Sequence, residues 1–283
     1  MDKIQIIADS TCDLTEEILN KYNITIIPLC VIMGNETYRD GVNVTPEDIY
    51  AWSEKENSTP KTAAPLLNDV VDMIQPFTTK EREIIFFGIS EDMSSTCNVV
   101  RLAADFLNYK KIHIINSKNL STGIGLQVLK AAVMAEEGHS AKDIVNYIVN
   151  TMQDRVRASF IVDALTYLYR GGRCSSVTAL IGNTFQLKPM IIVKDGKMGV
   201  GKKYRGNIKK ALLNYVNDLK PELIEADRER IFITHSGCDD ETVNLIYDYI
   251  DNLHIFREII ITRAGGVISS HCGPKTLGVL FVS

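Results

Sequence analysis

The sequence lacks several features that would place the protein in a well-marked class. Its six cysteines contain no C-x-x-C pair, which argues against a zinc knuckle or a dithiol redox pair. The glycine-rich patterns G-x-x-x-x-G-K-[ST] and G-x-G-x-x-G are missing, so a nucleotide-phosphate cradle is not indicated. No uninterrupted apolar run approaches the roughly 20 residues of a membrane span. No two histidines have the spacing of a metal site, and no metal or cofactor is assigned.

An excess of basic residues is also missing. Lys and Arg number 31 against 35 for Asp and Glu, which gives a net charge of −4 and argues against a nucleic-acid binder. A hydrophobic share of 45% over 283 residues is typical of a folded chain with a sizeable core. The apolar stretch 4–8 is too short for a signal peptide and is interrupted by Gln5. We therefore expect reduced thiols and a cytoplasmic protein.

Short apolar runs alternate with helical patterns in the first half of the chain. Strands are expected at 4–8, 24–32, 83–89 and 112–115. Helices are expected at 15–22, 45–56, 66–75, 95–107 and 120–137. This alternation predicts an α/β domain, residues 1–155, whose mainly parallel sheet lies between helices.

The second half of the chain follows a different pattern. Asp195-Gly196 between two apolar runs is a hairpin signal, which requires antiparallel pairing. Residues 156–283 are therefore expected to form a second α/β domain with a mixed sheet and helices, although segments are able to cross between the domains. The expected strands are 159–162, 190–194, 199–204, 230–234, 258–262 and 277–282, and the expected helices are 207–225 and 240–253.

Small polar side chains follow three of the expected strands, at 9–11, 90–96 and 116–117. Because ligands bind outside the carboxyl ends of parallel strands, these loops are candidates for one site, with Ser95 and Thr96 among them. Each residue alone is better explained as a helix cap, and only their repetition after successive strands favours a site. Hydroxyls beside a helix N-terminus suit an anion, and a carboxylate fits this sequence better than a nucleotide phosphate.

Two other functional interpretations remain open. Gly88-Ile89-Ser90-Glu91-Asp92 approaches the nucleophile elbow of a serine hydrolase, with Ser90 or Ser94 as the nucleophile, but Asp92 stands where glycine is usual. The basic clusters 170–173 and 202–205 are either solvated surfaces or a docking patch of a regulatory interaction protein. The glycine-bearing stretch 265–274, expected to be a flexible loop, contains the titratable His271.

Six stretches taken in order resemble the DegV family of bacterial fatty-acid-binding proteins. The resemblance spans nearly the whole chain, although Ser95 and Lys275 stand where the family usually has glycine. The stretches are residues 9–14, 61–65, 89–98, 168–175, 187–189 with 195–196, and 271–274.

This resemblance implies a two-domain α/β protein that binds one long-chain fatty acid. It assigns the carboxylate to Thr62 and Ser94, with His271 nearby, and places the acyl tail in an apolar tunnel largely within the second domain. It further implies that the protein has no catalytic activity of its own. Such proteins present the carboxylate to a separate ATP-dependent fatty acid kinase, whose acyl-phosphate product feeds phospholipid synthesis. Arg173 and Arg205 would face that kinase, and membrane contact would be transient.

Overall fold

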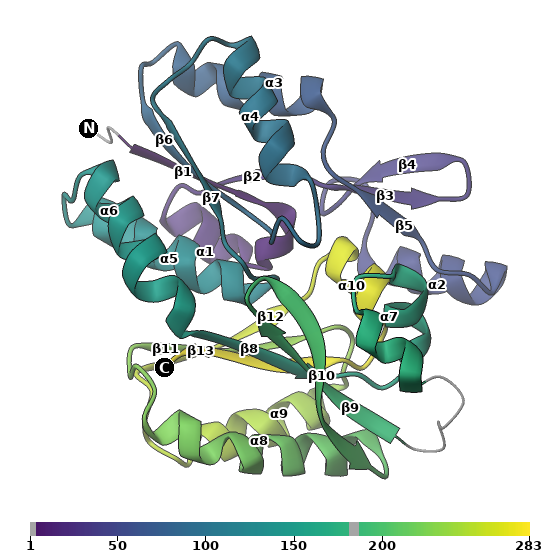
Figure 1. Ribbon diagram of the computed structural model, residues 1–283. Coiled ribbons are helices and arrows are strands. Elements are labelled where there is room, and N and C mark those ends of the chain that lie inside the picture. The colour runs from purple at the N-terminus through teal and green to yellow at the C-terminus, as the bar shows by residue number, and fades with distance from the viewer. Residues whose placement is uncertain (1–3, 181–186) are drawn as a thin grey trace.

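The structure, a computed structural model, describes residues 4–180 and 187–283 and is built around two main sheets (Figure 1). The first sheet has the order β2-β1-β6-β7, and every pairing in it is parallel, as the sequence predicted. Its strands are β1 (Ile4–Asp9), β2 (Thr25–Ile27), β6 (Glu83–Gly88) and β7 (Ile112–Asn116).

Helices cover both faces of this sheet, which explains why its central strands are apolar throughout. Along β6, Ile84 and Phe86 pack in one core cluster with α3 and α4, while Ile85 and Phe87 point to the other face, toward α5. The helices of this half are α1 (Glu16–Lys21), α3 (Leu67–Thr78), α4 (Thr96–Phe106), α5 (Thr122–Glu136) and α6 (Ala141–Tyr147).

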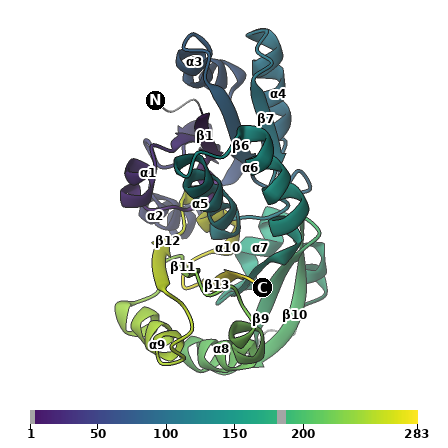
Figure 2. The same ribbon diagram turned by 90° about the vertical axis from the view of Figure 1, so that its left-hand side faces the viewer.

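The second sheet is mixed and has the order β10-β9-β8-β13-β11-β12. Among the strand pairs described in this sheet, only β11 with β12 is parallel. The predicted hairpin at Asp195-Gly196 joins β9 to β10. Its strands are β8 (Val156–Ile161), β9 (Leu187–Lys194), β10 (Lys197–Arg205), β11 (Arg230–His235), β12 (Glu258–Arg263) and β13 (Leu277–Val282). The helices α8 (Ile208–Ile224) and α9 (Asp240–Asp251) cover its outer face (Figure 2).

A third, three-stranded antiparallel sheet was not predicted. It contains β3 (Cys30–Met33), β4 (Glu36–Arg39) and β5 (Lys61–Ala63), in the order β4-β3-β5. The single strand expected at 24–32 is divided into β2 and β3 around Pro28, because proline has no amide hydrogen for the ladder. The helix α2 (Pro46–Glu56) follows, capped by Thr45 and Asp48 in a capping box.

The stretch 265–274 is a helix and not the flexible loop that the sequence suggested. Helix α10 (Gly266–Cys272) lies between the two main sheets in both views and contacts α2, α7 (Leu165–Gly171) and β3 (Figures 1 and 2). Two glycines followed by Val267 and Ile268 are a poor helical signal. The remaining short turns are η1 (Ser10–Cys12), the π-type η2 (Ile148–Met152), η3 (Gln153–Arg155) and η4 (Ser175–Leu180).

The division of the chain at residue 155 stays a prediction. All strands up to β7 belong to the parallel sheet or to the three-stranded sheet, and all strands from β8 belong to the mixed sheet. One core cluster nevertheless runs through both halves, from Ile6 and Ile124 to Phe160, Ile268 and Leu280. A single hydrophobic core therefore extends between the two main sheets, and α10 is inserted into it.

Three aspartates, Asp9, Asp13 and Asp40, are buried close to α10. None of them forms an ion pair with a Lys, Arg or His within the described residues. Removal from water raises the pKa of all three carboxyl groups, to about 6 for Asp9 and to about 8 for Asp13. Backbone amides and hydroxyls supply their hydrogen bonds instead.

These shifts predict that the protein loses stability as the pH rises from about 6.5 to 8. The folded state holds the Asp13 proton up to about pH 8, whereas the unfolded state releases it near 3.8, so the contribution to the unfolding free energy falls throughout that window. The pKa of His271 is lowered from 6.5 to about 4, which makes the unfolding free energy rise with pH, but only below pH 6.5. We expect a loss of up to about 1.4 kcal/mol per pH unit.

Urea unfolding across this pH range measures the effect. Asp13→Asn should reduce the slope, because the amide does not titrate, and the raised pKa of Asp40 accounts for slope that is left. Asp239→Asn, at an exposed helix cap, is the control and should retain it. An unchanged slope in Asp13→Asn would show that another group is responsible.

Candidate functional site

A cavity of about 220 Å³ lies beside α10 and brings together the predicted head-group residues. Thr62 on β5, Ser94 before α4 and His271 in the last turn of α10 all line it. Ser95 also lines this cavity, while Leu29, Leu120 and Ile268 supply apolar wall. Three segments far apart in the sequence thus meet at one cavity.

His271 and Thr62 form one side of this site. The Nε2 of His271 lies 2.7 Å from the Oγ1 of Thr62, while its Nδ1 is shielded from solvent and has no hydrogen-bond partner among the described residues. Burial of the ring, followed by the charge of Arg173, lowers the pKa of His271 to about 4, so the imidazole is neutral at pH 7.

The environment of Nδ1 also determines the tautomer of His271. A buried N–H without an acceptor is costly, so the proton belongs on Nε2, where it is donated to the Oγ1 of Thr62. The Thr62 hydroxyl accepts that bond and keeps its own hydrogen free to donate into the cavity. His271 thus prepares Thr62 to bind an acceptor such as a carboxylate.

Ser94 forms the opposite side of the site. Its Oγ lies 2.8 Å from the Oγ1 of Thr96, which is buried in the first turn of α4 and does not line the cavity. The Ser94 amide donates to the carbonyl oxygen of Ser90 at 3.0 Å, which closes the turn between β6 and α4. Thr96 therefore orients the Ser94 hydroxyl, and Ser94 is the member that reaches the cavity.

Arg173 lines the cavity, and its charge accounts for part of the pKa shift of His271. It has no carboxylate partner within the described residues, and its Nη1 donates to the carbonyl oxygen of Gly171 at 2.8 Å. Its position gives the site a positive charge at its exposed side. Arg205, at the end of β10, does not line the cavity. A docking role for either arginine stays a prediction.

A second, small apolar cavity of about 20 Å³ lies directly behind the first one. The two share Leu120, Ile268 and Cys272 as a common wall. The second cavity extends to Phe160 on β8 and Leu280 on β13, in the core between the two main sheets. Hydroxyls at one end and core side chains at the other describe a site for an amphipathic molecule.

Other parts of the molecule fit a functional site less well. A larger cavity of about 550 Å³ near β8 and β9 has a rim of exposed charges of both signs, including Arg157 and Glu222, and contains none of the predicted site residues. The Ser90 hydroxyl is buried and donates to the carbonyl oxygen of Gly196 at 2.7 Å. No histidine of the described chain hydrogen-bonds to Ser90 or Ser94, so the serine-hydrolase interpretation gains no support.

The described residues offer neither a metal-binding cluster nor a membrane-spanning helix. Residues 4–180 and 187–283 contain no group of three or more His, Cys, Asp or Glu side chains arranged to hold a metal ion. None of the helices in that part of the chain combines the length and apolar character that a membrane crossing needs.

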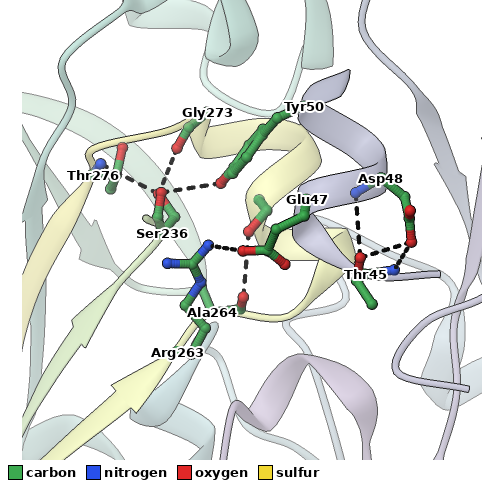
Figure 3. Close-up of polar contacts among 10 residues, drawn as sticks. Thr45, Glu47, Asp48, Tyr50, Ser236, Arg263, Ala264, Gly273 and Thr276 are labelled. Carbon is green, nitrogen blue, oxygen red and sulfur yellow. Dashed lines mark hydrogen bonds and ion pairs between the residues drawn. The ribbon is translucent and has the colours of Figure 1, made fainter. Parts of the chain in front are cut away.

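Helix α2, which packs against α10, is connected to the mixed sheet by polar contacts (Figure 3). The Tyr50 hydroxyl donates to the carbonyl oxygen of Ser236 at 3.1 Å, and Glu47 forms an ion pair with Arg263. The Ser236 hydroxyl in turn donates to the carbonyl oxygen of Gly273, directly after α10. The C-terminal end of α10, where His271 lies, is thus held from the mixed sheet.

Comparisons with known proteins place this geometry in context. Residues 3–283 match the model of a family described as "Uncharacterised protein, DegV family". A DegV domain-containing protein of Clostridium acetobutylicum is 32% identical over 282 residues, covering 100% of this chain and 99% of the relative.

Solved structures show the same fold. A DegV family protein from Thermus thermophilus, described as binding fatty acid, superimposes with a TM-score of 0.89 at 26% identity, covering 99% of both chains. A stearic acid-binding protein from Eubacterium ventriosum gives a TM-score of 0.85 at 26% identity, covering 98% of both chains.

Proposed function

The chain belongs to the DegV family, and we propose that it binds one long-chain fatty acid in the cavity beside α10. The observation that carries this proposal is that Thr62 and Ser94 line one cavity, and that only the side chains of Leu120, Ile268 and Cys272 separate it from an apolar cavity between the main sheets. Fatty acids bound by structural neighbours of similar fold support it.

The head group would be held by directed hydrogen bonds. The free hydrogen of Thr62 and the hydroxyl of Ser94 each donate to a carboxylate oxygen, and such bonds to a charged group contribute about 1.5–3 kcal/mol each. Arg173 adds a favourable charge from the exposed side. Because His271 is neutral, it acts through Thr62 and does not compete for the anion.

The tail would supply most of the affinity. Burial of about 16 methylenes of a C18 acid gains roughly 13 kcal/mol before the cost of immobilising the ligand is subtracted. The hydroxyls therefore set the orientation of the acid, with the carboxylate at Ser94 and the chain directed past Ile268. This orientation leaves the reactive end nearest to Arg173 and the surface.

Presentation of the carboxylate to a second protein is the role that we propose for this orientation. The protein would act without catalysis of its own in the cytoplasm, as the lipid-binding subunit of an ATP-dependent fatty acid kinase that forms an acyl-phosphate for phospholipid synthesis. Arg173 and Arg205 are the proposed docking residues, and the exposed positions of both support this assignment. Fatty acid would be exchanged during transient membrane contact.

Extraction of the purified protein with organic solvent, followed by mass spectrometry, tests the proposal. We expect one long-chain fatty acid per chain, and the loaded protein should yield hydroxylamine-trappable acyl-phosphate when a fatty acid kinase and ATP are added. A protein that is empty as purified and does not bind added stearate or oleate would contradict fatty-acid binding. Lipid binding without acyl-phosphate would contradict only the presentation role.

A further inference from the structure

The segment Asp9–Asp13, which the sequence singled out as a polar loop after β1, does not line the candidate cavity. It nevertheless contains two of the three buried aspartates, and its Ser10 hydroxyl donates to the Oδ2 of Asp40 at 2.8 Å. One short segment therefore connects all three carboxyl groups, and its contacts lead to both sides of the site.

We propose that Asp9, Asp13 and Asp40 are positioning residues of the head-group site, which hold the segment carrying Ser94 and the helix carrying His271 at a fixed separation. This inference rests on the proposed fatty-acid binding for its functional consequence. Its geometric part, the fixed position of His271, stands independently of any ligand.

Asp9 holds the Ser94 side. Its Oδ2 accepts a hydrogen bond from the amide of Ile89 at 2.7 Å, at the point where β6 ends and the turn to Ser94 begins. Its Oδ1 accepts from the amide of Thr11 at 3.0 Å, so the carboxyl group is itself fixed from two directions. Since Ile89 lines the cavity, Asp9 sets the start of the wall that carries Ser94.

Asp13 and Asp40 hold the His271 side. The first amides of α10 lack a side-chain cap of their own, because Gly265 stands at the N-cap. Instead the amide of Gly265 donates to the Oδ1 of Asp13 at 2.8 Å, and the amide of Gly266 donates to the Oδ1 of Asp40 at 2.6 Å. A Cβ at position 266 would lie 2.8 Å from that Asp40 oxygen, so the close approach requires glycine.

The site has little tolerance for movement of α10. The contact between His271 and Thr62 is 2.7 Å long, and a hydrogen bond weakens quickly when its atoms separate beyond about 3.2 Å. Burying three carboxyl groups without a cation costs stability, and apolar side chains of similar size would stabilise the core better. Apolar side chains, however, would not provide the directed hydrogen bonds that these carboxyl groups accept from the backbone on both sides of the cavity.

Alanine variants of the α10 contacts test this proposal in the full-length protein. Asp13→Ala and Asp40→Ala should each weaken stearate binding at least tenfold and shift the ¹⁵N resonances of the His271 ring. Asp13→Asn should restore affinity to within about threefold, because its amide oxygen still accepts from Gly265, and asparagine tolerates the left-handed φ of 51° at this position. Ile246→Ala, in the separate core under α9, is the matched destabilised control and should change neither readout.

Specific outcomes overturn the proposal. Folded alanine variants with wild-type His271 resonances would refute it, as would an Ile246→Ala variant that weakens stearate binding equally. If an alanine variant does not fold, Ser10→Ala decides, because it loosens Asp40 but retains all three carboxyl groups; a His271 shift is expected, and its absence refutes the proposal. If the wild type does not bind stearate, the proposed function fails, while the His271 resonances still test the positioning role.

Discussion

Ile268→Phe is expected to weaken stearate binding about 100-fold. Ile268 belongs to the wall that separates the head-group cavity from the apolar cavity behind it, and the proposed acyl chain has to pass this wall, which a larger ring would block. A tail that stops at this wall leaves at least three or four methylenes unburied, which corresponds to about 3 kcal/mol of lost affinity. Calorimetric titration with stearate and octanoate measures the loss, and the shorter octanoate should be affected much less.

Ile246→Phe is the matched control for this substitution. Ile246 is also a buried isoleucine, on α9, but it packs in the core on the outer face of the mixed sheet. Both variants suffer the strain of overpacking, about 1–3 kcal/mol of stability. If Ile246→Phe loses stearate affinity as strongly, or if Ile268→Phe binds stearate normally, the acyl chain does not pass Ile268.

Gly171→Ala is expected to weaken fatty-acid binding about 30-fold. A Cβ at position 171 would lie 2.3 Å from the Nδ1 of His271, so the imidazole has to leave the position in which its Nε2 bonds to Thr62. Without the hydrogen bond from Nε2, Thr62 is no longer held as a donor to the carboxylate, and a bond to a charged group worth about 2 kcal/mol is lost. A stearate titration combined with the ¹⁵N resonances of His271 measures both steps.

The neighbouring Gly172 offers a close control. It has a φ of 68°, which asparagine tolerates, and a Cβ there would meet no atom within 4 Å. Gly172→Asn should therefore bind stearate within about twofold of the wild type. Equal affinities for the two variants and the wild type would mean that the position of His271 is irrelevant to the head group.

The parts of the fold that local sequence determines were predictable. Both faces of the first sheet are buried, so β6 appears as a continuous apolar run, and Asp195-Gly196 supplies the positive φ angles that its hairpin needs. Helix α10 was missed because its first amides are capped by Asp13 and Asp40, which lie more than two hundred residues away. No local pattern records such a partner.

The loop that carries Ser94 was a candidate from the residues alone, but its grouping with Thr62 and His271 was predictable only through the family resemblance. Nothing in the spacing of Thr62, Ser94 and His271 shows that they meet, because their approach depends on β5, the turn after β6 and the missed helix α10. The apolar wall was not predictable, since Leu120 and Ile268 are indistinguishable in sequence from ordinary core residues. Arg173, predicted only to face a partner, also lines the cavity.

A crystal structure of the protein with bound stearate tests the central claim most directly. We expect its carboxylate oxygens within hydrogen-bond distance of the Thr62 and Ser94 hydroxyls, and its chain running past Ile268 toward Leu280. Stearate bound instead in the larger cavity near Arg157, or with its chain outside the core, would contradict the account.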